Sequence, residues 1–568
     1  MTGPRRAPYM PPKARDLKQP ATPKGGAAIL SRATALLLAT ILLSVFVGLS
    51  FWEMTGDSLT IDERVYLPAG YVYWTQKDFS LNREHPPLAK LWAALPLLAM
   101  NLKLPPVAPS LDAAAYQMNV GSGFLFTQNL DRILFWGRLP MLLLGLLLAI
   151  LVFWWSWELH GNAGAALVSL LLIGFEPSII AHSHYVATDV ALATFSVMAM
   201  FFLWRFTRGA AFYNLLLASS GLGLALASKF SAVFLVPVFF LLLLLKWPSG
   251  IATKDKQPVA SLQRGRVLGS LWAMLIAAVF VQASYLFSTD LTLYFKGLFT
   301  VNTYALPQSV LTYIHGDFFP GGVWWYSFYV LLLKLTLPTI IVITVAAASL
   351  AKNREIPNNG LVFTLLPAAV YLAANCAFAN NLGVRYLIPF LSFLLVFAGR
   401  AWFVFAKNRR NQMVGAVLSV WLLISLMRVS PHYISYFNEL VGGPVNAPHY
   451  LDDSNIDWGQ DLLRLMDYFR GRNIKEAVLG YWGPTPPEYY AGPDGILWQS
   501  WTYRMAGSRN PPPGVYAISV NNLIAIRRET IWLNQPWNPN FDWLNRFQPS
   551  DRIGYSIYIY RFPQAPQR

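Results

Sequence analysis

A polar stretch directly after the first apolar run concentrates the side chains that could do chemistry. It extends from Thr60 to Lys90 and reads TIDERVYLPAGYVYWTQKDFSLNREHPPLAK. Its ionisable residues include Asp62, Glu63, Asp78, Glu84, His85 and Lys90. Adjacent carboxylates beside a membrane are costly unless they have partners or a function. We therefore expect this stretch to hold a catalytic base, because a carboxylate within hydrogen-bond reach of a hydroxyl can accept its proton.

Four basic residues, of which Lys90 ends this stretch and three lie elsewhere, could meet a negatively charged group. Lys90 offers a point charge, and Arg138 and Arg385 offer forked donors that suit phosphate oxygens. Lys334, in YVLLLKLTLPT, falls inside an apolar run, where an ionisable group is a functional candidate by default. The alternative for such cations is that they extend toward lipid headgroups.

Three histidines raise the question of a metal site. His182 and His184 are separated by one residue, and His85 lies in the polar stretch. No cysteine or closely spaced HxxxH or HExxH pattern completes a ligand set, so we do not expect a metal there. No cofactor is predicted, although a divalent cation on Asp62 and Glu63 stays an open alternative. His85 and His184 are instead assigned to substrate binding.

The elements that must position these groups are membrane helices. Of the 568 residues, 55% are hydrophobic and 13% are charged, against about 25% charged in soluble proteins. A spanning helix needs roughly 20 apolar residues, which predicts an α-helical integral membrane protein with about eleven transmembrane helices. The expected spans lie near 29–52, 132–157, 163–180, 186–206, 211–228, 231–246, 267–287, 323–350, 360–379, 385–405 and 412–428.

The charge distribution sets an orientation. The net charge of +16 is concentrated in the tail 1–28 and in connections such as 246–266 and 352–354, whereas the loop 53–131 carries more acids than bases. The positive-inside rule then places residues 1–28, as a disordered tail, in the cytoplasm and loop 53–131 outside. Because the basic excess follows the topology, we do not expect nucleic acid as a partner.

The composition changes after Arg428. Residues 429–568 lack long apolar runs and are rich in proline, asparagine and tryptophan. The segment 461–472 has helical spacing, and 476–482, 514–520 and 554–560 are typical of strands. The sequence thus predicts a small extracytoplasmic α/β domain, whose tryptophans could stack on sugars but are expected mainly to pack in its core.

Four motifs resemble those of the glycosyltransferase-C superfamily, in the branch of protein O-mannosyltransferases and lipid A aminoarabinose transferases. They are the acidic pair Asp62-Glu63, the HPPLAK element 85–90, the GRLP element 137–140 and the RYLIP element 385–389. Ala89 stands where the family's HPPLGK element has glycine. The motifs cover roughly residues 29–428, which the resemblance makes the catalytic membrane domain, and residues 429–568 resemble uncharacterised bacterial members.

The resemblance implies a reaction and assigns roles. Such enzymes transfer a sugar from a polyprenyl phosphate to an acceptor hydroxyl with inversion, with Asp62 as the base. Glu63 and Asp189 would be further acidic site residues. Lys90, Arg138, Arg385 and Lys334 would bind the donor phosphate. Helix capping is the competing explanation for Asp62, because Thr60-x-x-Glu63 fits a capping box, and for Asp189, which follows Thr188.

Partners and alternatives follow from the same comparison. The expected partners are a polyprenyl-phosphate sugar donor, an acceptor protein or glycolipid, and the bilayer of a bacterial inner membrane. Protein O-glycosylation is favoured over a glycolipid or polysaccharide acceptor. A transporter of lipid-linked substrates is the rival class, but it should show repeated halves and polar groups near the mid-bilayer. The sequence does not identify the sugar.

Overall fold

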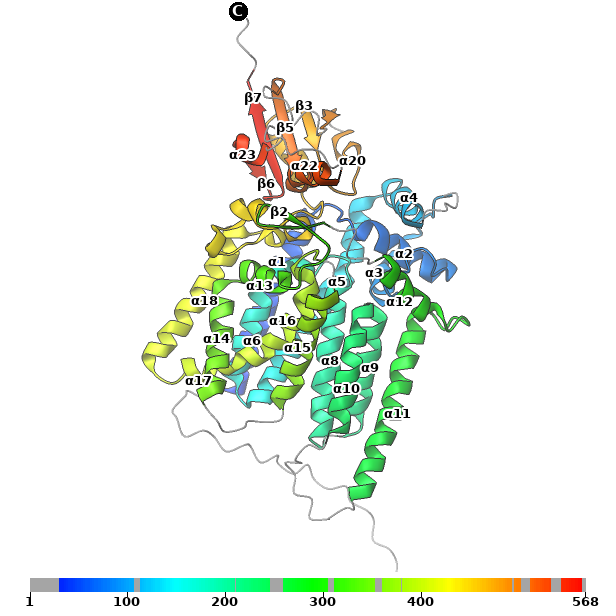
Figure 1. Ribbon diagram of the computed structural model, residues 1–568, viewed down its shortest axis with the longest axis vertical. Coiled ribbons are helices and arrows are strands. Elements are labelled where there is room, and N and C mark those ends of the chain that lie inside the picture. Colours follow the sequence, from blue (N-terminus) through cyan, green and yellow to red (C-terminus); the bar gives the residue numbers. More distant parts are fainter. Residues whose placement is uncertain are drawn as a thin grey trace, which may run out of the picture.

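A bundle of long helices carries a small sheet and a group of short helices at one end (Figure 1). The computed structural model describes residues 30–106, 113–209, 211–245, 259–304, 311–352, 360–378, 381–492, 495–501, 511–532 and 543–563. The tail expected over 1–28 lies outside them, as does most of the basic connection expected over 246–266.

The fold is that of an α-helical membrane protein. Within the described residues, seven helices are long and apolar enough to cross a membrane. They are Arg32–Gly56 (α1), Leu130–His160 (α5), Asp189–Thr207 (α8), Arg266–Ser284 in α11 (Val259–Ser284), Gly360–Phe378 (α15), Val384–Phe405 (η4 to α17) and Arg409–Val429 (α18). Three further expected spans form shorter apolar helices of 10–17 residues in the same bundle. These are α6 (Ala163–Phe175), α9 (Tyr213–Ser228) and η2 with α10 (Phe230–Leu244).

The span expected over 323–350 is not one continuous helix, because the chain is broken there. Helices α13 (Tyr326–Lys334) and α14 (Leu337–Lys352) meet at an angle of 114°. Pro338 lies in the first turn of α14, where its missing N–H costs nothing but where it cannot continue a preceding helix. The buried Glu176 carboxylate accepts hydrogen bonds from the backbone N–H and the hydroxyl of Thr336, so the break has its own polar support.

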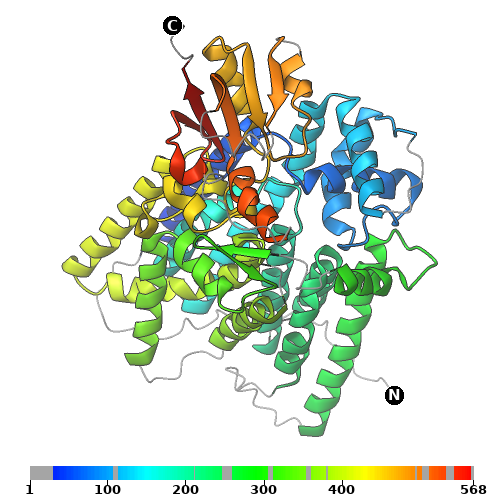
Figure 2. The same ribbon diagram turned by 45° about the horizontal axis from the view of Figure 1, so that its top comes forward.

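The chain also forms short helices, of which α2, α3, α4 and α12 lie at the end of the bundle that carries the sheet (Figures 1 and 2). The short helices are α2 (Glu63–Gln76), α3 (Leu88–Ala94), the 3-10 helix η1 (Leu95–Met100), α4 (Ala113–Phe126), α7 (Pro177–His182) and α12 (Leu293–Tyr304). Helix α3 packs closely on α2 at Gly70, where an added Cβ would lie 2.1 Å from the carbonyl oxygen of Lys90. Only glycine permits this approach. It holds α2, which lies within the polar stretch 60–90, against α3, which begins at the end of that stretch.

The C-terminal region forms a five-stranded sheet with strand order β4-β3-β5-β7-β6. Strand β3 pairs in parallel with β4 and β5, whereas β7 pairs antiparallel with β5 and β6. The strands are β3 (Glu476–Gly480), β4 (Leu497–Ser500), β5 (Gly514–Ser519), β6 (Asp551–Ile553) and β7 (Ile557–Phe562). Helices α19 (Leu462–Gly471), α20 (Glu488–Ala491), α22 (Val520–Trp532) and α23 (Trp543–Arg546) accompany them, and a hairpin of β1 (Leu311–Ile314) and β2 (Asp317–Pro320) lies nearby. The expected helix over 461–472 and the three expected strands are present, while β4, β6 and α22 were not anticipated.

Candidate functional site

Asp62 and Arg385 form an ion pair at the upper end of the bundle. Nη1 of Arg385 lies 2.6 Å from Oδ2 of Asp62. Asp62 immediately precedes α2, whereas Arg385 belongs to the 3-10 turn η4 (Val384–Leu387), 323 residues further along the chain. The Asp62 side chain is 21% exposed and that of Arg385 is 9% exposed, so the carboxylate still reaches the surface. The structure thus brings the predicted base against one of the predicted phosphate-binding residues.

Helix capping does not account for Asp62. The residue stands at the N-cap position of α2 but makes no side-chain capping hydrogen bond. Oε2 of Glu63 instead accepts hydrogen bonds from the backbone N–H of Thr60 at 3.0 Å and from its hydroxyl at 2.9 Å. This is the reciprocal half of a capping box. Glu63 therefore supports the helix start and leaves Asp62 available to Arg385.

Glu63 and Arg138 form a second, fully buried pair. Nε and Nη2 of Arg138 donate to the two oxygens of Glu63 at 2.8 and 2.7 Å. The remaining three N–H groups of Arg138 donate to backbone carbonyls, namely those of Met54, Asp57 and Ser58. Burial alone would raise the pKa of Glu63, but the guanidinium outweighs burial and lowers it. All five N–H groups of Arg138 are engaged, so in this conformation it has none left for a phosphate.

Lys90 is also committed within the protein. Its ammonium is completely buried and donates to the carbonyl and side-chain oxygens of Asn82 at 2.8 and 2.7 Å and to the carbonyl of His85 at 2.8 Å. The hydroxyl of Tyr73 lies 3.2 Å away. Lys90 therefore shapes the turn that carries His85. In this conformation Asp62 is paired with Arg385, whereas the donors of Lys90 and Arg138 are engaged by groups within the protein.

A second ion pair, between Asp189 and Lys229, lies against the first. Nζ of Lys229 lies 2.6 Å from Oδ1 of Asp189, at the start of α8. The same ammonium lies 4.0 Å from the ring centroid of Tyr386, and the guanidinium of Arg385 lies 5.2 Å from that centroid. The two acid–base pairs thus meet at one aromatic ring. We call Asp62, Arg385, Asp189, Lys229 and Tyr386 the Tyr386 cluster.

Asp189 uses its carboxylate on Lys229 and not as a helix cap. The N-cap residue of α8 is Thr188, and no side-chain capping hydrogen bond is formed there. Lys229 was missed in the sequence. It directly follows α9, between two expected spans, at the end where the positive-inside rule disfavours a cation. That exception was the signal which could have identified it.

His85 borders the Tyr386 cluster, whereas His184 does not. Burial lowers the pKa of His85 well below its usual value, with Lys229 and Lys90 adding to the effect. Its ring packs edge-on against Tyr66, with centroids 5.8 Å apart. His184 is completely buried, and its Nε2 lies 3.4 Å from Asp57. It belongs to the interior that joins the membrane helices to the C-terminal region.

Lys334 lies at the end of α13, at the helix break. Its ammonium donates to the carbonyl oxygens of Ile434 at 2.8 Å and Asn455 at 2.7 Å, and it lies 4.6 Å from the ring centroid of Phe437. It therefore fastens the break to the chain that follows α18. No group of three or more histidine, cysteine or acidic residues that could hold a metal ion occurs in the part of the chain that the structure describes.

The neutral histidines next to the cluster predict a pH effect on stability. His182 lies in α7, its Nδ1 is 2.8 Å from the carbonyl oxygen of Ser178, and burial lowers its pKa from 6.5 to about 4. A histidine that is harder to protonate when folded stabilises the protein above its unfolded pKa and destabilises it as the pH falls. Between pH 6.5 and pH 4 the free energy of unfolding should decrease by up to about 1.4 kcal/mol per pH unit for one proton. We therefore expect the melting temperature in detergent to decrease over the same range. The variant His182→Gln should show a shallower decrease, and an unchanged slope would contradict this assignment.

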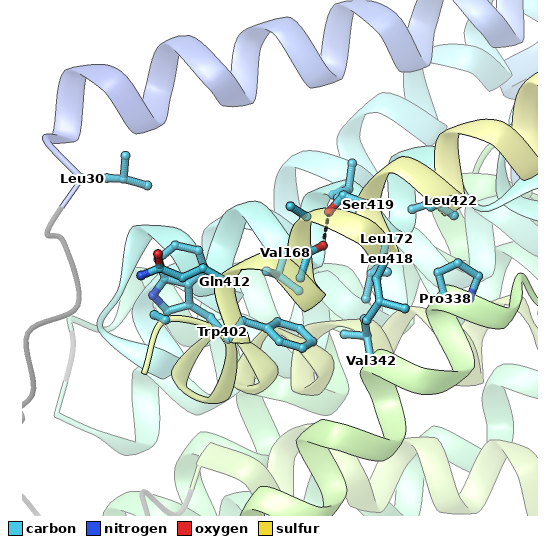
Figure 3. A pocket seen from close by; sticks show the side chains of 15 residues that line it. Leu30, Val168, Leu172, Pro338, Val342, Trp402, Gln412, Leu418, Ser419 and Leu422 are labelled. Carbon is cyan, nitrogen blue, oxygen red and sulfur yellow. Dashed lines mark hydrogen bonds between the residues drawn. The ribbon is translucent and has the colours of Figure 1, made fainter. Parts of the chain in front are cut away.

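An apolar cavity lies elsewhere in the part of the chain that the structure describes. It encloses about 410 Å³ between α6, α14, α17 (Trp402–Phe405) and α18, and Trp402, Leu418 and Leu422 are among its lining residues (Figure 3). The polar side chains Gln412 and Ser419 also line it, but none of the residues of the Tyr386 cluster does. The cavity is therefore separate from the ion pairs described above.

The family model of dolichyl-phosphate-mannose-protein mannosyltransferases matches residues 35–307. The solved structure of ArnT from Cupriavidus metallidurans, in the apo state and bound to undecaprenyl phosphate, is similar at 12% identity and a TM-score of 0.46, covering 93% of this chain and 98% of that one. An oligosaccharyltransferase from Archaeoglobus fulgidus, in complex with Zn and sulfate, is similar at 11% identity and a TM-score of 0.36, covering 84% and 68%. No curated protein sequence matches.

Proposed function

We propose that this chain, whose residues 35–307 match the family model of dolichyl-phosphate-mannose-protein mannosyltransferases, is a glycosyltransferase of the glycosyltransferase-C superfamily that transfers a sugar from a polyprenyl-phosphate donor to an acceptor hydroxyl. The observation that carries the proposal is the Tyr386 cluster, in which two carboxylates and two cations meet at the end of the bundle. The favoured acceptor is a protein hydroxyl, with a glycolipid or polysaccharide as the alternative. The proposed location is a bacterial inner membrane, with the cluster on the extracytoplasmic side.

Asp62 is the proposed general base. Its carboxylate is the more exposed member of its ion pair and makes no capping bond, so an acceptor hydroxyl can approach it. As the acceptor oxygen forms its bond to the anomeric carbon, its proton passes to Asp62. The bond between that carbon and the phosphate oxygen breaks, and its electron pair leaves with the polyprenyl phosphate. Attack opposite the leaving phosphate inverts the configuration.

Arg385 and Lys229 are the proposed cations for the departing phosphate. Nη1 of Arg385 holds Asp62, but its buried Nε has no hydrogen-bond partner among the described residues. A phosphate oxygen would supply one, and a fixed cation beside the leaving group lowers the barrier to its departure. Asp189 keeps Lys229 next to the same ring. Lys90 and Arg138, whose donors are used within the protein, act in this proposal as the supports of the site.

The direct test is transfer by the purified protein in lipid nanodiscs. Polyprenyl-phosphate sugars labelled in the sugar would be offered with peptides that contain serine and threonine, and with glycolipid acceptors. We expect the label to move to an acceptor and free polyprenyl phosphate to appear in equal amount. Failure of every donor to react, with the protein folded, would contradict the proposal.

The role of Arg385 gives a separate prediction. In Arg385→Gln we expect kcat/KM for the donor to fall about 100- to 1,000-fold, the effect of losing one fixed donor to a developing anion. The acceptor KM should change little. Arg472→Gln is a matched control, because Arg472 also pairs with an aspartate and lies over a tyrosine ring but is 56% exposed. An equal loss in both variants, or none in Arg385→Gln, would contradict the assignment.

A further inference from the structure

The C-terminal region contacts the chain immediately before Asp62 at several points. The backbone N–H of Ile61 donates to the carbonyl of Trp458 at 3.2 Å, and that of Ser58 donates to the carbonyl of Gln460 at 2.8 Å. In return, the N–H of Leu463 donates to the hydroxyl of Ser58 at 2.7 Å. Residues 58–61 and 458–463 therefore bond to each other directly. The position of Asp62 depends on a segment nearly 400 residues away in sequence.

Three charged side chains, one arginine and two aspartates, form ion pairs at the same junction. Nη1 of Arg464 lies 2.5 Å from Oδ1 of Asp57 and 2.7 Å from Oδ1 of Asp461. Burial would raise the pKa of Asp57, but Arg464, His184 and Arg138 together lower it. Asp57 also accepts a hydrogen bond from the hydroxyl of Tyr185. The loop that leads into Asp62 is thus held on both sides.

Trp458 connects this junction to the Tyr386 cluster. Its side chain is almost completely buried, and the guanidinium of Arg385 lies 4.4 Å from its ring centroid. The ring is wedged between neighbours, with Tyr185 at 5.6 Å and His182 at 6.0 Å between centroids. Trp458 itself cannot move freely. It therefore presents a fixed aromatic face to Arg385.

We infer that Trp458 is a positioning residue of the site, acting through Arg385, and this inference rests on the proposed function. Arg385 has two tasks at once, because Nη1 holds Asp62 while Nε has to face the donor phosphate. A guanidinium that stacks on a fixed ring keeps one orientation. Without the ring, Arg385 can rotate to engage Asp62 with two of its nitrogens, including Nε, or turn toward Asp189, with which its charge already interacts. Either movement withdraws the donor that the phosphate needs.

The inference also gives the C-terminal region a role in the reaction. Its backbone at Trp458 sets the chain before the base, and the ring of the same residue sets the cation for the leaving group. Trp458 thus helps to place both the proposed base, Asp62, and Arg385, the proposed cation for the leaving phosphate. The region is part of the site and not an appended domain.

The test compares Trp458→Leu with Trp458→Phe in the full-length protein, using transfer from the donor that the wild-type protein consumes. We expect Trp458→Leu to lower kcat/KM for the donor about 10- to 100-fold with the acceptor KM unchanged. Trp458→Phe keeps a flat ring and should stay within about 5-fold of the wild type. Combining Trp458→Leu with Arg385→Gln should give no further loss beyond Arg385→Gln alone, because both changes act on one group.

Two results would overturn the inference. One is full activity of Trp458→Leu, and the other is a loss that multiplies with that of Arg385→Gln. Trp543→Leu is the control for loss of a buried tryptophan, because Trp543 is equally buried but packs on Tyr516 and Phe547 of the C-terminal region. It should lower the melting temperature and leave kcat per folded molecule unchanged. If the wild type transfers no sugar at all, the proposed function fails first, and that outcome is distinct from both results above.

Discussion

Replacing Asp62 by asparagine should nearly abolish sugar transfer. Asparagine has the same shape and can still accept a hydrogen bond from Arg385, so the site should keep its geometry. It cannot take the acceptor proton at neutral pH, and loss of a general base costs about 100- to 10,000-fold in rate. We expect kcat to fall by that factor while the KM for the lipid donor changes little. The measurement is single-turnover transfer from a saturating labelled donor.

The matched control for this change is Asp78→Asn. Asp78 belongs to the same polar stretch but is exposed. Its Oδ1 accepts a hydrogen bond at 2.8 Å from the backbone N–H of Ser80, within the same turn. Its replacement should leave kcat within about 2-fold of the wild type, as is usual for surface changes away from a site. Equal activity of Asp62→Asn and Asp78→Asn would remove Asp62 from the mechanism.

The convergence of distant segments was predictable from the sequence, because it follows from topology. The runs that contain Asp62, Asp189 and Arg385 all end at the same side of the membrane in a simple alternation of spans. The structure places these three residues around Tyr386, as described above. Their ion-pair partners could not be read from spacing, since a partner depends on which helices are neighbours. The pairing of Lys229 with Asp189 is one such case, although the place of Lys229 at the outer end of a span already set it apart.

The interruption of the bundle at Lys334 escaped prediction for a different reason. An apolar run of 28 residues reads as one helix when only its hydropathy is considered. The bend of 114° lies between Lys334 and Leu337, where Thr336 bonds to Glu176 on a distant loop and Pro338 follows in the first turn of the next helix. Leu335 and Leu337 conceal this polar residue within an apolar pattern. The partner of this polar residue is set by tertiary structure, which the hydropathy pattern does not show.

The sequence could not distinguish Arg138 from Arg385, although the structure engages their donors differently. Both open apolar helical runs and both suit a phosphate. Arg138 lies among the carbonyls of Met54, Asp57 and Ser58 and uses every donor, whereas Arg385 keeps a buried Nε without a partner among the described residues. Which arginine keeps an unused N–H donor depends on how the chain after α1 folds back over α5. That is a property of backbone geometry and not of residue type.

This difference leads to the second large prediction, for Arg138→Gln. The change leaves the carboxylate of Glu63, which is completely buried, without its cation, and it removes donors from three carbonyls. Breaking a buried ion pair by removing one partner costs about 3–5 kcal/mol, a large part of a total stability of about 5–15 kcal/mol. We expect a much lower yield of folded protein and a melting temperature in detergent well below that of the wild type.

Two further variants separate this explanation from loss of phosphate binding. Arg132→Gln changes an exposed arginine in the same helix and should have little effect on stability. In Glu63→Gln/Arg138→Gln the buried charge is gone, so the double variant should be more stable than Arg138→Gln alone. An Arg138→Gln protein that melts like the wild type but no longer binds the donor would return Arg138 to the phosphate site. If the Arg138→Gln variant were as stable as the wild type, the five hydrogen bonds of Arg138 would not be what maintains the loop before Asp62. The position of Asp62 would then need another cause.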